Sequence, residues 1–84
     1  MKQILYFSAE WCGPCKMIKP MIHGLQLQSQ ISITFIDADA SPDTCKIWNV
    51  RNVPTLLVIK NSMEVGRLVG TSITRDAVIN LYNK

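Results

Sequence analysis

The segment that decides the fold reads Ala9-Glu10-Trp11-Cys12-Gly13-Pro14-Cys15-Lys16. It contains a Cys-x-x-Cys motif, which in an intracellular protein is typical of redox or metal chemistry. A β-favouring stretch, Gln3 to Ser8, precedes the motif, and apolar residues at intervals of three and four follow it, which predicts a helix from about Cys12 to Leu27. Cys12 is therefore expected at a helix N-terminus, where unpaired amides and the helix dipole favour a thiolate.

Downstream, alternating apolar residues, capping residues and turn residues predict the remaining elements. These are a strand at Ile31–Ile36, a short helix at about Pro42–Asn49 capped by Ser41, strands at Leu56–Ile59 and Met63–Val69 on either side of an Asn61-Ser62 turn, and a last helix capped by Thr74. The order β-α-β-α-β-β-α is typical of an α/β fold. We expect a four-stranded mixed sheet with helices on both faces, the first two strands being parallel.

The chain has 84 residues, of which 18% are charged, and a net charge of +3. This length predicts a single domain over residues 1–84. The basic residues are scattered singly, which excludes a nucleic-acid-binding stripe. The apolar run Ile4–Phe7 is too short for a secretory signal or a membrane span. Together with an odd number of cysteines, three, this predicts a cytoplasmic protein with no membrane partner.

The motif and its surroundings resemble thioredoxin. Residues 9–16 followed by Pro20 resemble the active-site segment of that family, and Val53-Pro54-Thr55 resembles its cis-proline loop. Val69-Gly70 resembles the glycine segment beside the substrate groove, and Asp37-Ala38-Asp39 resembles an acidic pair at a strand end. The resemblance extends from Ile4 to Tyr82.

The resemblance implies a dithiol-disulfide oxidoreductase of protein disulfides, with Cys12 as the nucleophile, Cys15 as the resolving thiol and no cofactor. It also implies a substrate groove lined by Trp11, Gly13, Pro14, Val53, Pro54 and Gly70. The expected reductant is a flavoprotein reductase of the thioredoxin type. Two alternatives stay open: a glutathione-coupled, glutaredoxin-like protein, and a non-catalytic binding subunit with a thioredoxin fold.

The chain departs from the family pattern at three places. It lacks the usual first strand and helix, so Ile31–Ile36 becomes a sheet edge, and we expect a monomer that pairs weakly through this edge. Tyr6 stands where the family commonly has a buried aspartate, and Phe35 replaces the lysine that faces it. Ser8 stands where many members carry a tryptophan. The group that accepts the Cys15 proton is therefore an open question.

Two further residues could carry chemistry. Cys45 is interpreted as a small buried hydrophobic residue, with a regulatory thiol as the alternative. His23 falls on the polar side of the long helix, away from the cysteines, and is interpreted as a solvated surface residue. The spacings of these residues and the motif cysteines match no usual zinc site, so no metal is expected.

Overall fold

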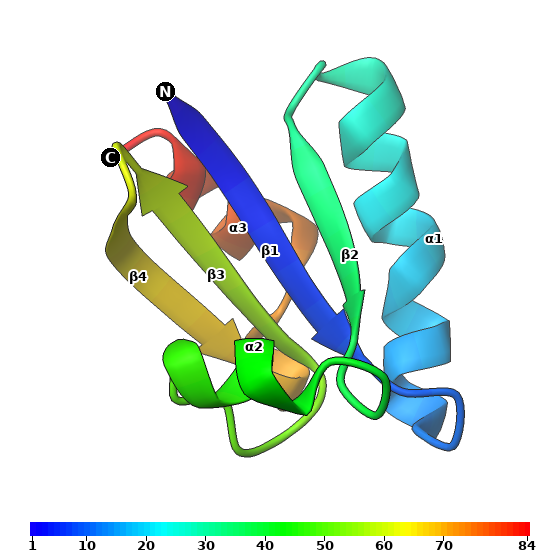
Figure 1. Ribbon diagram of the computed structural model, residues 1–84. Coiled ribbons are helices and arrows are strands. Elements are labelled where there is room, and N and C mark those ends of the chain that lie inside the picture. The colour runs from blue at the N-terminus through cyan, green and yellow to red at the C-terminus, as the bar shows by residue number, and fades with distance from the viewer.

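The computed structural model describes residues 1–84 and consists of one sheet with helices packed on it (Figure 1). The strands are β1 (Lys2–Ser8), β2 (Ile33–Asp37), β3 (Thr55–Lys60) and β4 (Met63–Val69), and the helices are α1 (Gly13–Gln28), α2 (Pro42–Ile47), a 3₁₀ turn η1 (Gly70–Ser72) and α3 (Arg75–Tyr82). The strand order is β2-β1-β3-β4. β1 is parallel to β2 and antiparallel to β3, which is antiparallel to β4. The predicted fold class and element order are confirmed.

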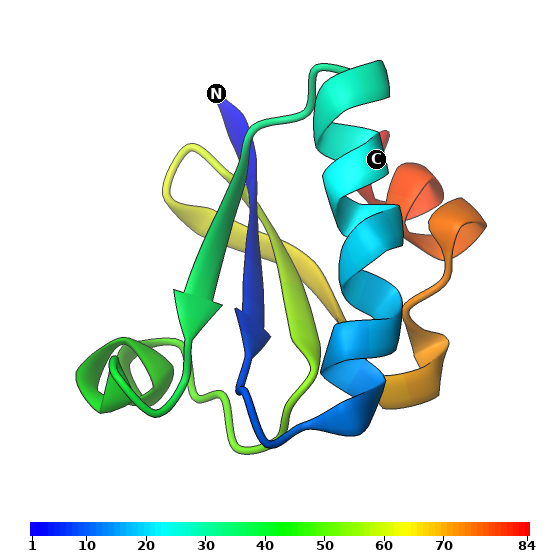
Figure 2. The same ribbon diagram turned by 90° about the vertical axis from the view of Figure 1, so that its right-hand side faces the viewer.

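The helices cover both faces of the sheet (Figure 2): α1 and α3 lie on one face and α2 on the other. Alternate residues of β1 separate accordingly. Ile4 and Tyr6 belong to the larger apolar cluster, to which α1 and α3 contribute, whereas Leu5 and Phe7 belong to the cluster against which Trp48, just after α2, packs. The central strands β1 and β3 are therefore buried on both sides, as the unbroken apolar run of β3 predicts.

Several boundaries differ from prediction for local backbone reasons. The second strand begins at Ile33 rather than Ile31, because its pairing with β1 begins at Ile33, opposite Ile4. The short helix ends at Ile47, and Asn49 has a φ of 55°. Ser41 occupies the N-cap position of α2, but its side chain makes no capping hydrogen bond.

Other local predictions are confirmed. Thr74 caps α3, because its side chain accepts a hydrogen bond from the Ala77 amide. Asn61 in the β3–β4 turn takes the left-handed conformation, with φ at 53°. None of the helices combines the length and the apolar composition that crossing a membrane requires.

The topology places the Cys-x-x-Cys motif at the carboxyl ends of two adjacent strands. β1 and β2 are parallel, so the segments that follow Ser8 and Asp37 leave the sheet at the same edge. The first segment carries the cysteines, and the second carries Asp39. This arrangement brings residues far apart in the sequence to one end of the sheet.

Candidate redox site

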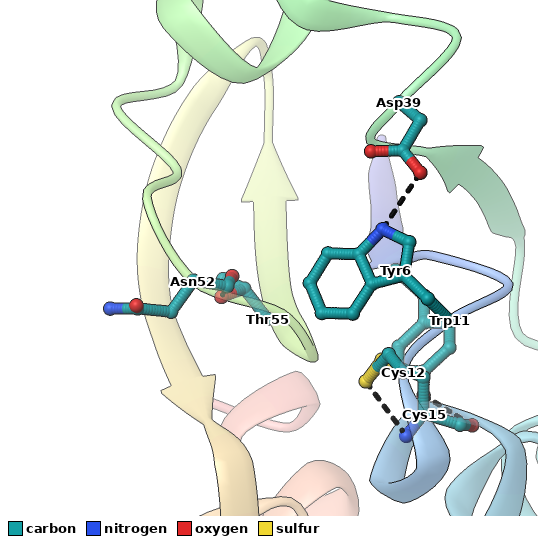
Figure 3. The surroundings of a disulfide bond; sticks show 7 residues. All are labelled: Tyr6, Trp11, Cys12, Cys15, Asp39, Asn52 and Thr55. Atoms are coloured by element: carbon teal, nitrogen blue, oxygen red, sulfur yellow. Dashed lines mark hydrogen bonds between the residues drawn. A yellow bond between two sulfur atoms is a disulfide. The ribbon is translucent and has the colours of Figure 1, made fainter.

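The two motif cysteines lie at the start of α1 and form a disulfide, with Cα atoms 5.3 Å apart. Cys12 is the N-cap residue, and its Sγ accepts a hydrogen bond from the Cys15 amide at 3.2 Å (Figure 3). Gly13 and Pro14 begin the helix. Proline fits this position because its fixed φ suits a first turn, in which its missing N–H has no helical partner to lose.

Both sulfur-bearing residues are nearly covered. Cys12 is 4% exposed and Cys15 2%, and they pack with Ala9 and Val53. The exposed fractions of the two cysteines therefore differ little in the disulfide form. What distinguishes them is position, because only Cys12 lies at the end of the helix with a backbone N–H directed at its sulfur.

The loop before β3 packs against the disulfide. The Val53-Pro54 bond is cis, which confirms the prediction, and Val53 contacts the cysteine cluster. Thr55 Oγ1 donates to the Asn52 carbonyl at 2.6 Å and ties the loop to itself. The Gly70 amide donates to the Pro54 carbonyl at 3.0 Å. These contacts join the two loops at which the groove residues were expected.

The expected groove residues differ in accessibility. Trp11 is 71% exposed, and Gly13 and Pro14 are also exposed at the start of α1. Val53 and Gly70 are half-buried, whereas Pro54 is buried. Gly70 has a φ of 59°, a conformation that glycine adopts without the penalty of a Cβ.

The Trp11 side chain is held across the site. Its Nε1 donates to Asp39 Oδ2 at 2.8 Å, and Figure 3 shows the indole extending from the cysteines toward that carboxylate. The sequence analysis identified the acidic pair Asp37 and Asp39 but did not predict the hydrogen bond between Trp11 and Asp39. The parallel pairing of β1 and β2 could have indicated it, because the segments that follow two parallel strands leave the sheet at the same edge.

A cavity of about 480 Å³ adjoins the exposed indole. Trp11 and Val53 line it together with Cys45 and Arg51. Cys45 is half-buried and not fully buried as expected, although it packs against the apolar cluster on the α2 face. The site surface thus extends from the disulfide toward α2.

Tyr6 lies directly behind the first turn of α1. Its side chain is fully buried, and its hydroxyl donates to the Cys15 carbonyl at 3.0 Å. The ring meets Phe35 edge to face, with centroids 5.9 Å apart. Desolvation by burial raises the pKa of Tyr6 above its ordinary value.

The exposed His23 lies on α1, outside the cysteine cluster. Its ring stacks on Phe35 with centroids 4.3 Å apart, and Lys19 Nζ lies 5.7 Å from the same ring centroid. The predicted surface position of His23 is confirmed.

Comparisons with known proteins agree with this geometry. The family model described as Thioredoxin matches residues 1–84. A thioredoxin of Chlamydia trachomatis is 38% identical over 82 residues, which cover 96% of this chain and 79% of that protein. A thioredoxin of Staphylococcus aureus is 39% identical over 70 residues, covering 81% and 67% of the two chains.

Solved structures give the same result. A mutant thioredoxin of Halobacterium salinarum superposes with a TM-score of 0.89 at 32% identity, covering 98% of this chain and 72% of that one. Thioredoxin 1 of Thermosipho africanus gives a TM-score of 0.86 at 27% identity, covering 96% and 90%. With its disulfide at the start of α1, the chain belongs to the thioredoxin family and is a thiol-disulfide oxidoreductase.

Proposed function

We propose that the protein reduces disulfides of other proteins, with Cys12 as the nucleophile and Cys15 as the resolving thiol. The Cys12 thiolate attacks one sulfur of the substrate disulfide, which forms a mixed disulfide and releases a substrate thiolate. Cys15 then loses its proton and attacks Cys12 Sγ, so that the mixed disulfide breaks and the second substrate thiolate leaves. Two electrons pass from the dithiol to the substrate, and the Cys12–Cys15 disulfide forms.

The observation that carries this assignment is the position of Cys12 Sγ at the N-cap of α1. It accepts the Cys15 amide there, and the positive end of the helix dipole favours negative charge at the same point. In the reduced protein this environment stabilises a thiolate on Cys12 in preference to Cys15.

The substrate groove comprises Trp11, Gly13, Pro14, Val53, Pro54 and Gly70. The bond from the Gly70 amide to the Pro54 carbonyl supports this proposal, because it holds the two loops beside the disulfide. The exposed indole of Trp11 provides an apolar contact for the polypeptide around the substrate cysteine. An extended peptide can pair with loop backbone of this kind.

The proposed reductant is a flavoprotein reductase of the thioredoxin type, and the proposed compartment is the cytoplasm, whose reducing conditions a dithiol donor requires. The proposed reaction uses no cofactor and no metal, and the protein is proposed to bind no nucleic acid. Residues 1–84 are proposed to form a single functional domain. In this proposal the protein is a monomer with a weak tendency to pair through its edge strand.

Single-cysteine variants test the assignment of the thiols. Cys15→Ser should accumulate a mixed disulfide with a protein substrate, and Cys12→Ser should not. If Cys12→Ser traps substrate and Cys15→Ser does not, the two roles are reversed. A double serine variant that keeps the protein's cellular function would support the binding-subunit alternative instead.

The reductant is tested in parallel assays of one model disulfide. Reduction should proceed with a thioredoxin-type reductase and NADPH, and should be slow with glutathione and glutathione reductase. Faster turnover in the glutathione assay would favour the glutaredoxin-like alternative.

A further inference from the structure

Tyr6 is a buried titratable residue that the thiol exchange described above does not use. It is fully buried, and its hydroxyl donates a hydrogen bond to the backbone carbonyl of Cys15. The bond connects the centre of β1 to the first turn of α1. It thus holds the main chain of the resolving cysteine from the buried side of α1.

No carboxylate occupies the interior around Cys15. All six acidic residues of the chain are exposed. The buried cluster that contains Cys15 otherwise holds Ala9 and Cys12, with Val53 packed against it. The interior therefore offers no group that can take the proton of the Cys15 thiol.

A solvent-open groove reaches Cys15 from the side of α1 and β2. It has a volume of about 630 Å³, and Cys15 forms part of its wall with Ser8 and Phe35. The charged residues that line it are Glu10 from the loop after β1, Lys16 and Lys19 from α1, and Asp37 from β2. All four side chains are exposed to solvent, so the groove is open to water and dissolved buffer beside Cys15.

From this arrangement we propose that Tyr6 is a positioning residue for Cys15, and that the Cys15 proton passes to water or a dissolved base in the groove and not to a side chain of the protein. The proposal rests on the assignment of Cys15 as the resolving thiol. In the resolving step the S–H bond of Cys15 breaks, its proton goes to the solvent base, and its electron pair forms the bond to Cys12 Sγ. The departing substrate thiolate takes up a proton from solvent.

The roles of the two parts are separable. The Tyr6 hydroxyl holds Cys15 in place and stays neutral across the working pH range, because burial raises its pKa. It therefore affects the rate of resolution at every pH by the same factor. The solvent base sets how that rate depends on pH and on buffer.

A single-turnover reaction of the reduced protein with a chromogenic aryl disulfide separates the two chemical steps. Attack by Cys12 releases the first coloured thiolate, and resolution by Cys15 releases the second. Tyr6→Phe keeps the ring and removes only the hydroxyl. It should slow the second release by about 5- to 30-fold, as expected for a lost buried hydrogen bond, and leave the first unchanged.

The matched control is Tyr82→Phe, since Tyr82 is the other of the chain's two tyrosines and lies on α3 under Lys2. Both releases should keep their parental rates in this variant. The pH profile of the second release should show one ionisation in the parent and the same one in Tyr6→Phe. At fixed pH and ionic strength, the second release should become faster as imidazole buffer is added.

The outcomes distinguish the inference from the proposed function. If Cys15→Ser still releases both coloured thiolates in one turnover, Cys15 is not the resolving thiol and the proposed function fails. If Cys15 resolves but Tyr6→Phe does so at the parental rate, Tyr6 is not a positioning residue. The rate of the second release could instead be independent of buffer concentration and show a second ionisation that disappears in Asp37→Asn or Glu10→Gln. That result would show that a side chain, and not a solvent base, takes the Cys15 proton.

Discussion

The indole of Trp11 donates a hydrogen bond to the Asp39 carboxylate at 2.8 Å, although 71% of the Trp11 side chain is exposed. An exposed indole of this size is free to adopt several rotamers unless a partner selects one. Asp39 is that partner. Its own backbone amide is bonded to Asp37 Oδ1 at 2.9 Å, so the acceptor is itself held in place. The bond orients the apolar surface beside the disulfide before a substrate arrives.

Asp39→Ala should therefore weaken the binding of protein disulfides more than their chemistry. A lost hydrogen bond of about 0.5–1.5 kcal/mol corresponds to an increase in KM of about two- to tenfold, with kcat nearly unchanged. Asp39→Asn keeps an acceptor oxygen and should lie close to the parent. Asp76→Ala, on the exposed side of α3, serves as a control for the lost charge. Equal KM values for the parent and Asp39→Ala would show that the bond does not orient the indole.

Gly70 carries a backbone requirement that a stability measurement can test. Its φ of 59° penalises any Cβ, and no heavy atom lies within 4 Å of the position that a Cβ would take. The cost of Gly70→Ala is therefore conformational, about 1–2 kcal/mol, and corresponds to a loss in Tm of roughly 4–8 °C per kcal/mol. Gly70→Asn should lose less, because asparagine tolerates this region better.

The matched substitution is Gly24→Ala. Gly24 lies inside α1, where a Cβ also meets nothing within 4 Å, but its φ is not positive. Alanine there should raise the free energy of unfolding by up to about 1 kcal/mol. Melting curves of the two variants should thus move in opposite directions. A lower Tm in both variants would mean that the added side-chain volume, and not the backbone conformation, determines the effect at these two positions.

Acid should weaken the link between β4 and α2. Arg67 pairs with Glu64 at 2.7 Å and also donates to the carbonyls of Trp48 and Asn49 at the end of α2. The hydrogen bond from Arg67 lowers the pKa of Glu64 below its ordinary value of 4.5. A lowered pKa in the folded state contributes stability above pH 4.5 that is lost as pH falls through the folded-state value.

Because the pair is partly exposed, this contribution should be below about 1 kcal/mol. Glu64→Gln should lower the free energy of unfolding slightly at neutral pH and should not differ from the parent at pH values well below 4. Urea titrations over this pH range measure the difference. A gap between the two proteins that persists undiminished in acid would show that the carboxylate charge is not responsible.

The sequence predicted the fold because the local signals and the global topology agree. The alternating apolar residues of β2 correspond to a partly exposed strand and the unbroken apolar run of β3 to a strand buried on both faces, and Thr74 and the Asn61 turn act as expected. The cysteine motif predicted its own position at a helix start for the same reason. These features depend on residues close together in the chain.

The contacts that were not predicted join side chains of one element to the backbone or side chains of another. Trp11 with Asp39, and Tyr6 with the Cys15 carbonyl, depend on how strand ends and helix starts are packed, which composition does not specify. Cys45 was expected to be buried, but it is half-buried and lines the wall of a cavity. Another contact that was not predicted is the hydrogen bond from the Gln26 side chain to the edge strand.

Edge protection by Gln26 leads to a prediction about self-association. β2 ends the sheet, and the bonds from the Ile4 amide to Ser32 and from the Ala38 amide to Ser8 fix which residues face β1. Ile33, Phe35 and Asp37 therefore direct their backbone groups to the open edge. Gln26 Nε2 donates a hydrogen bond to the Ile33 carbonyl at 3.2 Å, and the Ser41 amide donates one to the Asp37 carbonyl at 3.0 Å. The backbone amide and carbonyl of Phe35 stay available to pair with a second copy of the chain.

Gln26→Ala should raise the tendency to dimerise, because it exposes one more carbonyl on the edge. Gln28→Ala, at the exposed last residue of α1, should leave association unchanged. Thr34→Lys places a charge on the edge strand and should reduce pairing. Sedimentation equilibrium up to millimolar protein measures all three. If Gln26→Ala and the parent are both strict monomers at the highest concentration, the edge is not the site of association.

The last prediction concerns a carboxylate placed at Tyr6. Tyr6→Asp replaces a fully buried ring, so it leaves a cavity and places an ionisable group where burial raises the pKa of a carboxyl. Tyr6→Asn leaves a similar cavity without the charge. The comparison between the two variants therefore isolates ionisation from packing.

The sign follows from the raised folded-state pKa. Below the unfolded value of about 3.9 the carboxyl is protonated in both states, and Tyr6→Asp should be about as stable as Tyr6→Asn. As pH rises above that value only the unfolded chain ionises, so the Asp variant should lose about 1.4 kcal/mol for each unit by which its pKa is raised. Both variants should melt below the parent, since a large buried side chain has been truncated.

The rate of mixed-disulfide resolution should move the other way. An ionised carboxylate at position 6 adds a base on the buried side of Cys15, so near neutral pH Tyr6→Asp should resolve faster than Tyr6→Asn and depend less on added buffer. Single-turnover kinetics with the chromogenic disulfide, together with urea titrations from acid to neutral pH, measure both effects. Tyr6→Asp and Tyr6→Asn could instead resolve the mixed disulfide at equal rates and have equal free energies of unfolding at pH 7. The carboxylate would then be exposed to solvent and would not interact with Cys15, and position 6 would not control how the resolving thiol loses its proton.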